Sequence, residues 1–231
     1  MKYKTVIIVL LNLIIFTACT SNNDSSKSND KKVSDLNQAF IYSAEKGDTA
    51  KVTKLLQDGA NINTTNEQGT TAVLAATYNN EINTVKVLID QGADINIRDN
   101  NLNNVLLYAS AEGLLDIVKL AIDAGADTSI TNRFGGTALI PAAERGHVEV
   151  VKALLTRSEI DVNHINNLHW TALMEAIILS DGGKKHQEIV QLLIDHGADA
   201  TIGDEDGITP LQHAEKRGFH EIAEILKQAE A

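Results

Sequence analysis

The side chains that could carry out chemistry are seven histidines and one cysteine. The histidines all lie in the second half of the chain and are His147, His164, His169, His186, His196, His213 and His220. The zinc hydrolase motif HExxH, begun by His220-Glu221, would need a histidine at position 224, where the chain has Glu224. We therefore expect no enzymatic activity, no metal and no cofactor. A histidine-dependent hydrolase using His164 and His169 is kept as a remote alternative.

A second candidate for chemistry is the segment Asp181–Lys185, which reads DGGKK. Glycine-rich loops bind phosphate where they follow a β-strand and open a helix. The surrounding sequence shows no strand of that kind, so we interpret the segment as a lengthened turn between two helices. The single cysteine, Cys19, cannot form an internal disulfide.

The N-terminal residues have the pattern of an export signal. Two lysines within the first four residues precede an apolar run over residues 5–16, and the small residues Thr17 and Ala18 follow. A charged start, a short apolar core and small residues are typical of a secretory signal peptide. The run is shorter than the roughly 20 residues that a membrane-spanning helix needs, so a permanent transmembrane anchor is not expected.

The residues before the cysteine make this interpretation more specific. The sequence Ile15-Phe16-Thr17-Ala18-Cys19 resembles the lipobox of bacterial lipoproteins, with Phe16 where leucine is usual. The resemblance implies cleavage of a 1–18 signal peptide and attachment of acyl chains such as palmitate at Cys19. The exported protein would then be lipid-anchored to the bacterial cell membrane or outer membrane, facing outside the cytoplasm. Residues 19–34 would be the lipidated cysteine and a polar, disordered tether.

The charge balance excludes one class of partner. The formal charge is −11, and removal of residues 1–18 would leave 18 basic and 31 acidic side chains, a charge of −13. Nucleic-acid binding needs clustered lysine and arginine to contact phosphates, so no nucleic-acid partner is expected. Anionic lipid headgroups attract basic segments, so acyl chains rather than charge would hold the protein at a membrane.

From about residue 35 the sequence repeats with a period of 33. Gly59, Gly92 and Gly125 are spaced by 33 residues. Within a unit, apolar residues at i, i+3, i+6 and i+7 predict one buried helix face, for example at Val148 and Val151. The pattern predicts an all-α solenoid domain over residues 35–231. Its six helix-turn-helix units are expected at about 35–65, 66–98, 99–131, 132–165, 166–203 and 204–231.

Recurring motifs identify the repeat. The segment Thr209–Ala214, TPLQHA, resembles the TPLHxA signature of ankyrin repeats. Thr171–Ala176 and Thr137–Ala142 resemble the same signature, with alanine in place of its proline. The resemblance implies that His147 and His196 make structural hydrogen bonds and that the first and last units are caps. Two departures stand out. Pro141 is expected to disturb the first turn of its helix, and Asn104 replaces threonine in a degenerate unit.

The resemblance also implies where a partner would bind. Ankyrin proteins bind other proteins through the turns that project between units and through the exposed inner helices. Aromatic and arginine side chains dominate such interfaces. The partner-binding residues predicted in this way are Tyr78, Arg133, Phe134, Arg145, Leu168 and Trp170. For Trp170 a second interpretation stays open, in which the indole packs on the neighbouring turn.

These observations predict a non-catalytic, membrane-tethered ankyrin-repeat module that mediates protein–protein interaction in the bacterial cell envelope. We expect another protein as its partner and no small-molecule substrate. Two narrower roles remain open: an immunity protein that neutralises a toxin, and a support factor for an envelope enzyme. An acidic, rigid binder would suit a basic toxin. A structural spacer that binds nothing is the remaining alternative.

Overall fold

The computed structural model describes residues 22–229, and their side chains from residue 31 onward. Within this part the only β-structure is one isolated bridge between Thr65 and Thr71, so the predicted all-α fold is confirmed. The helices are α1 (Asn22–Glu45), α2 (Thr49–Gln57), α3 (Ala72–Tyr78), α4 (Ile82–Asp90), α5 (Val105–Ala111), α6 (Leu115–Asp123), α7 (Leu139–Glu144), α8 (Val148–Arg157), α9 (Ala172–Ile178), α10 (Lys184–Asp195), α11 (Pro210–Arg217) and α12 (His220–Ala229).

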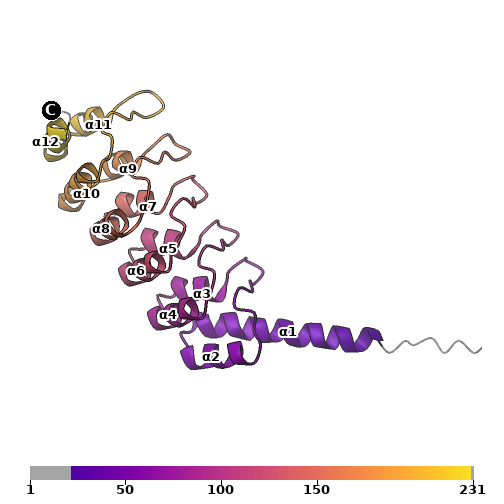
Figure 1. The fold of residues 1–231 in the computed structure, drawn as a ribbon. Coiled ribbons are helices and arrows are strands. Elements are labelled where there is room, and N and C mark those ends of the chain that lie inside the picture. Colours follow the sequence, from indigo (N-terminus) through magenta and orange to yellow (C-terminus); the bar gives the residue numbers. More distant parts are fainter. Residues whose placement is uncertain (1–21, 230–231) are drawn as a thin grey trace, which may run out of the picture. The chain divides into compact units, whose positions relative to one another are not determined.

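From Leu36 onward the helices form a stack of pairs (Figure 1). In each pair from α3/α4 to α11/α12, the first helix packs on the second and on the first helices of adjacent pairs. The second helices, from α2 to α12, contact one another in the same order. Such neighbour-only packing is the defining property of a solenoid. The loops before the first helices all project to the same side of the stack (Figure 1).

Four of the first helices, α3, α5, α9 and α11, begin at side-chain caps that the sequence motif supplies. Thr71 Oγ1 accepts a hydrogen bond from the backbone N–H of Leu74 (3.3 Å), and Thr171 and Thr209 do the same for the residues three positions on. In the unit expected to be degenerate, Asn104 Oδ1 accepts from Leu107 N at 2.9 Å. Asparagine caps a helix as well as threonine does, so α5 is regular although the motif of this unit is degenerate.

Pro141 changes the start of α7, as its position in the motif predicts. Proline has no N–H, so the Thr137 carbonyl accepts instead from Ile140 N (3.2 Å), three rather than four residues on. The helix begins at Leu139, without a side-chain cap. Thr137 Oγ1 is buried and has no hydrogen-bond partner within the described residues. The proline therefore leaves the cap residue in place but unused.

We expect Pro141→Ala to raise the free energy of unfolding by about 1 kcal/mol. The alanine N–H restores the backbone bond to Thr137 and allows its hydroxyl to cap the helix, each contributing about 1 kcal/mol. The greater freedom of the unfolded chain offsets part of this gain. Urea denaturation measures the change. Thr137→Ala in the parent should cost little, because its hydroxyl has no partner to lose; a large loss would contradict this account of α7.

The interior of the stack combines small and larger apolar side chains. The first helices meet through alanines that are fully buried, namely Ala76, Ala109, Ala142, Ala176 and Ala214. Small side chains at these places let adjacent helices approach closely. Leucine, isoleucine and valine of the second helices, such as Leu88 and Leu154, complete a single hydrophobic core. Burial of this face is the main stabilising contribution, because each short helix is marginal alone.

The loops that close the units are tied to one another by asparagine side chains. Asn63 Oδ1 accepts from Asp94 N (2.9 Å), Asn96 Oδ1 from Asp127 N (3.0 Å), and Asn163 Oδ1 from Asp199 N (2.8 Å). Each bond joins a loop to its counterpart in the next unit. The units are therefore held in register by polar contacts at this edge as well as by the apolar core.

Helix α1 covers more of the chain than the sequence indicates. It begins at Asn22, within the polar segment that we expected to be a disordered tether. Residues 22–45 contain no glycine or proline, and each residue added to an existing helix gains a backbone hydrogen bond. The predicted signal peptide 1–18 and Cys19 lie outside the described residues. Over residues 22–229, no helix combines the length and apolar character needed to cross a bilayer.

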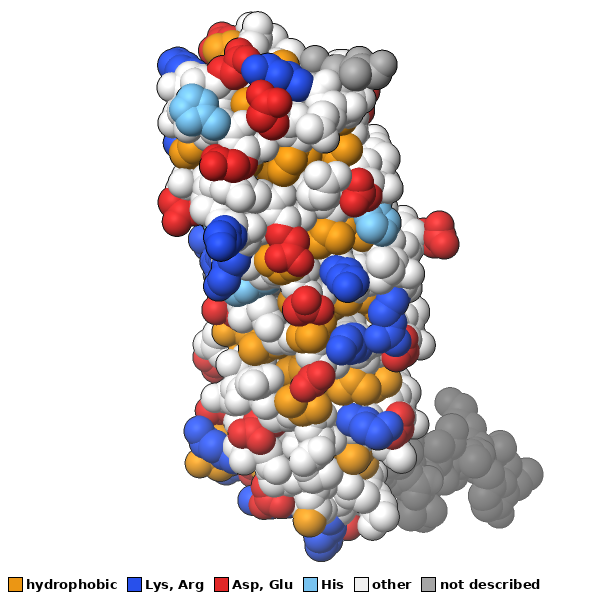
Figure 2. Space-filling model, turned by 90° about the vertical axis from the view of Figure 1, so that its left-hand side faces the viewer, with side chains coloured by type: hydrophobic (Ala, Val, Ile, Leu, Met, Phe, Trp, Pro, Cys, Tyr) orange, Lys and Arg blue, Asp and Glu red, His pale blue; other side chains and the backbone are white. Residues whose placement is uncertain are grey.

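The face formed by the second helices carries mixed charge. Figure 2 shows acidic and basic side chains interspersed there, with narrow apolar strips between them. Several charges pair within or between helices, as Arg157 does with Asp123 at 2.7 Å. Exposed pairs of this kind contribute little to stability. The loops and the first helices, by contrast, carry exposed apolar side chains beside two hollows.

Candidate functional site

The loops before the first helices hold their tips with one repeated contact. Asn132 Oδ1 accepts from Phe134 N (2.9 Å) and Gly136 N (3.0 Å). Asn166 Oδ1 accepts in the same way from Leu168 N (2.9 Å) and Trp170 N (3.0 Å). With the backbone fixed by these bonds, the Phe134 and Leu168 side chains are 54% and 52% exposed. The loops thus present apolar side chains to solvent on a rigid backbone.

Phe134 separates two hollows on this face. The first, which we call the arginine hollow, has a volume of about 330 Å³ and lies between the units of α5 and α7. Arg145 donates to Ala111 O (2.9 Å) and pairs with Glu112 (2.6 Å) across this junction. The Arg133 guanidinium lies 4.8 Å from the centre of the Phe134 ring. The residues that line the hollow include Arg133, Phe134, Arg145, Tyr108, Glu112 and Glu144.

The second, which we call the acid hollow, lies between the units of α7 and α9 and has a volume of about 190 Å³. Its apolar walls are Phe134, Ile140, Pro141, Leu168 and Leu179, and its polar lining is Asn132, Glu144, Asn166 and Glu175. Leu179, at the end of α9, is 49% exposed. An apolar pocket with a few fixed polar groups is the usual form of a binding site.

Glu175 is the unusual residue of the acid hollow. Its side chain is buried, with 5% of the residue exposed, and Asn166 Nδ2 donates to its Oε1 at 2.7 Å. Burial, assisted by the negative charge of Glu144, raises the pKa of Glu175 to about 7 from the usual 4.5, and the Asn166 hydrogen bond opposes this rise. Within residues 31–229, no basic side chain forms an ion pair with Glu144 or Glu175.

The structure brings together four of the six residues predicted from the sequence. Arg133, Phe134 and Arg145 line the arginine hollow, and Phe134 and Leu168 line the acid hollow. Trp170 lines neither hollow and is partly buried, in keeping with the packing interpretation that the sequence left open.

Although it packs against Tyr108 of the arginine hollow, Tyr78 lines neither hollow. Its hydroxyl donates to Asp99 Oδ2 (2.5 Å), and its ring packs edge-on against Tyr108, with centroids 4.4 Å apart. Burial, followed by the hydrogen bond to Asp99, raises the pKa of the Tyr78 hydroxyl above its usual value. The side chain is thus engaged within the protein at the junction of two units.

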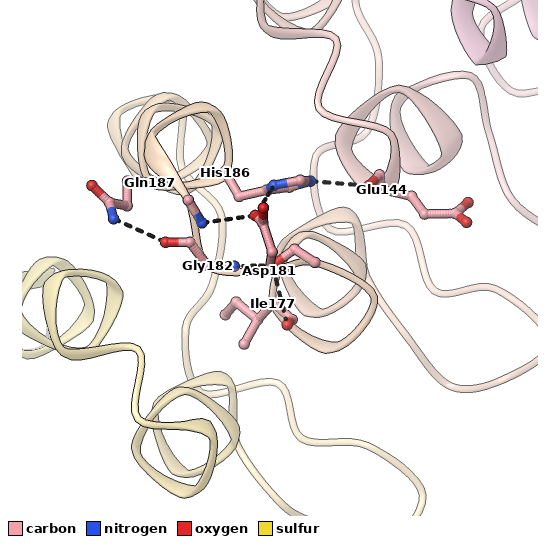
Figure 3. A network of polar contacts seen from close by, with 8 residues as sticks. Glu144, Ile177, Asp181, Gly182, His186 and Gln187 are labelled. Atoms are coloured by element: carbon pink, nitrogen blue, oxygen red, sulfur yellow. Dashed lines mark hydrogen bonds and ion pairs between the residues drawn. The ribbon is translucent and has the colours of Figure 1, made fainter.

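Residues Asp181 to Gly183 lie in the turn between α9 and α10 (Figure 3), and Lys184 and Lys185 are the first residues of α10. Asp181 Oδ1 accepts from Gly183 N (2.9 Å) and Ser180 Oγ accepts from Gly182 N (3.1 Å), so neither N–H is directed at a ligand. His186 bridges the Glu144 carbonyl (3.0 Å) and Asp181 (3.5 Å). The interpretation as a lengthened turn is confirmed.

Five of the seven histidines make structural contacts through a ring nitrogen. His147 Nε2 is 3.1 Å from Ala111 O and His196 Nδ1 is 2.7 Å from Leu192 O, as the repeat resemblance implies. His164 Nε2 lies 2.7 Å from Gly135 O, which ties it to the preceding loop. Among the described residues, no three histidine, cysteine, aspartate or glutamate side chains gather as a metal site would require.

Stacked helix pairs with projecting loops and a hollowed loop face define a helical-repeat protein of the kind that binds other molecules on one continuous surface. The family model for ankyrin repeats (3 copies) matches residues 10–99, 36–132 and 106–204. The chain therefore belongs to the ankyrin repeat family. Proteins of this family are generally non-catalytic modules of protein–protein interaction.

Individual relatives agree with this assignment. Residues of this chain are 54% identical over 78 positions to YahD of Escherichia coli (strain K12), whose name places it among ankyrin repeat proteins; the match covers 34% of this chain and 39% of YahD. The crystal structure of an ankyrin repeat domain from Acinetobacter baumannii AYE has a TM-score of 0.81 at 47% identity, covering 83% of this chain and 97% of that one. The crystal structure of the ankyrin repeat protein EF0377 has a TM-score of 0.80 at 39% identity, and the match covers 83% of this chain and 98% of that one.

Sequence reasoning missed two parts of the acid hollow, Glu175 and Leu179. A signal for Glu175 was present: it stands fifth in the motif Thr171–Ala176, where two other units carry Ala75 and Pro141. Two further units carry Tyr108 and His213 there, so Glu175 is the one carboxylate among these five units. A carboxylate is rarely buried unless it is paired, which makes this position a candidate for a special role. Leu179 offered a similar signal, because the equivalent position in other units carries the exposed polar residues Asn79, Glu112, Arg145 and Arg217.

Proposed function

We propose that this protein binds another protein on its loop face, around Phe134, while lipid chains on Cys19 hold it at the outer side of a bacterial membrane. The signal peptide is residues 1–18, and residues 19–34 connect the anchor to the repeats. The observation that carries the binding proposal is the Phe134 ridge. An exposed aromatic ring between two hollows, with Leu168 and Leu179 beside it, is typical of an interface hot spot.

Replacing Phe134 by alanine should weaken partner binding about tenfold or more, which corresponds to about 1.4 kcal/mol. The partner is first identified by crosslinking in the native envelope and mass spectrometry, and its affinity is then measured with purified components. Tyr42→Ala is the matched control, because Tyr42 is also an exposed aromatic residue but lines neither hollow. Circular dichroism should be unchanged in both variants. Equal affinities of the parent and Phe134→Ala would remove the ridge from the interface.

The anchor is tested at its single thiol. Cys19→Ala should move the protein from the membrane fraction to the soluble fraction, because two or three acyl chains give stable attachment and none can form without the thiol. Thr20→Ala, one residue away, should leave the protein with the membranes. The measurement is an immunoblot of the two fractions. Undiminished membrane attachment of Cys19→Ala would contradict lipidation.

Charge favours one of the narrower roles. The formal charge of −11 and the unpaired carboxylates of the acid hollow suit a basic partner. A toxin-neutralising immunity protein would bind such a partner directly, whereas a support factor would bind an envelope enzyme irrespective of its charge. Co-expression with a basic toxin encoded beside this gene should restore growth under the first role and have no effect under the second.

A further inference from the structure

We propose that the acid hollow receives an arginine side chain of the partner protein. The guanidinium group would lie at Glu175 and Glu144, and the aliphatic stem would pass between Phe134 and the two leucines of the rim, Leu168 and Leu179. This inference rests on the proposed function of the loop face and specifies the chemistry of the partner.

The acid hollow contains two carboxyl groups, and no basic side chain of the described residues pairs with either of them. Glu175 receives one hydrogen bond, from Asn166 to Oε1, and among the described residues its Oε2 accepts none. The charged group that acts on Glu175 is the carboxylate of Glu144, which repels it because both are negative. Burial of a carboxylate costs free energy to the extent that its oxygens lack a cation or hydrogen-bond donors, and within the described residues one oxygen of Glu175 has neither. No basic side chain of residues 31–229 pairs with Glu144 or Glu175, so a cation from outside would complete the site.

The walls select a cation with an apolar stem. Phe134, Leu168 and Leu179 are about half exposed and stand around the opening, while Ile140 and Pro141 are buried beneath them. A long basic side chain can bury its methylene groups against such walls and direct its charged end inward. A small inorganic cation would leave this apolar surface in contact with water.

The shape of the charged group favours arginine over lysine. A planar guanidinium carries five N–H donors and can bond to two carboxylates and stack on an aromatic ring, and it is more weakly hydrated than an ammonium group. Phe134 already stacks with a guanidinium, that of Arg133 at 4.8 Å. Arg133 lines only the arginine hollow, whereas Phe134 lines both, so the ring also contributes to the acid hollow.

The test uses three capped peptides and the full chain with labelled methyl groups. The probes are acetyl-Leu-Arg-Leu-amide and its lysine and glutamine counterparts, titrated while the methyl signals of Ile140, Leu168 and Leu179 are followed by NMR. We expect the arginine peptide to shift these signals saturably and to bind at least tenfold tighter than the glutamine peptide. Equal binding of these two peptides, or no binding at millimolar concentration, would overturn the proposal. Lysine binding equal to arginine binding would overturn the choice of arginine.

A variant separates recognition from folding. Glu175→Gln should weaken binding of the arginine peptide at least tenfold, whereas Glu188→Gln, which removes an exposed charge on α10 of the same unit, should leave it unchanged. Because the first change is expected to stabilise the fold, weaker binding cannot be attributed to unfolding. Unaltered affinity in Glu175→Gln would refute the inference. It would leave the loop-face proposal standing, since that depends on the separate Phe134→Ala measurement.

Discussion

Replacing Glu175 by glutamine is expected to raise the free energy of unfolding by up to about 3 kcal/mol at pH 8. The charged carboxylate is held in a buried place without a cation, and its pKa is raised to about 7. Each unit of pKa difference between the folded and unfolded states corresponds to about 1.4 kcal/mol. Glutamine has the same shape and can still accept the Asn166 hydrogen bond through its carbonyl oxygen.

The gain should depend on pH in a definite direction. Below about pH 4.5 the carboxyl group is protonated in both the folded and the unfolded chain, so it makes no difference to stability. Between pH 4.5 and 7 the unfolded chain releases the proton first, and the parent protein loses stability as the pH rises. Above pH 7 the loss is complete. The advantage of the glutamine variant should therefore be largest at pH 8 and close to zero at pH 4.

Urea denaturation of the parent and of Glu175→Gln at the two pH values measures this effect. Glu188→Gln serves as the control for the general loss of one negative charge, because its side chain is exposed. A gain of equal size at pH 4 and pH 8 would show that ionisation of Glu175 is not the cause. A buried charge that destabilises a fold is commonly kept for function, which is why the stability and peptide-binding results are expected to change in opposite directions.

Replacing Gly182 by alanine should cost about 3 kcal/mol. Gly182 lies in the turn between α9 and α10 with φ of +69°, and a Cβ there would lie 2.5 Å from Cδ1 of Phe219. The left-handed backbone alone costs a residue with a side chain about 1–2 kcal/mol. The remainder comes from displacing the Phe219 ring, which packs against the core just before α12.

Gly197→Ala is the matched control for this change. Gly197 has φ of +89° in the same unit, but nothing lies within 4 Å of the place a Cβ would take. The Gly197→Ala variant should lose only the stability that the left-handed backbone costs. The difference in unfolding free energy between the two variants therefore isolates the contact with Phe219. Because units stabilise only their neighbours, hydrogen exchange should increase first in α11 and α12. Equal losses in the two variants would show that the ring moves aside freely.

The fold could be derived from the sequence because its determinants are local. The caps Thr71, Thr171 and Thr209 act on N–H groups three residues away, and each apolar stripe lies within one helix. Pro141 was correctly expected to disturb α7, for the same reason. The start of α1 at Asn22 was not predicted, because a polar composition alone does not distinguish a helical segment from an irregular one.

The site could be derived only in part, because it is made by residues of different units. Phe134 and Leu168 come from loops 34 positions apart, and the sequence places both on the exposed tips. Whether an aromatic side chain stays free depends on its neighbours: Tyr78 is held by Asp99 of the next loop. The burial of Glu175 likewise depends on how α7 and α9 approach each other, which no single-unit pattern contains.

Each hollow is the joint product of two consecutive units, and the asparagine links between loops repeat the same geometry along the stack. Under the function proposed for the loop face, the specificity of a hollow belongs to a pair of neighbouring units rather than to one unit. If one 33-residue unit were duplicated, deleted or exchanged, new pairs of units would become neighbours and would form new hollows. The sequences of the remaining units would not have to change. Related proteins with rearranged repeats would therefore present different hollows on the same fold.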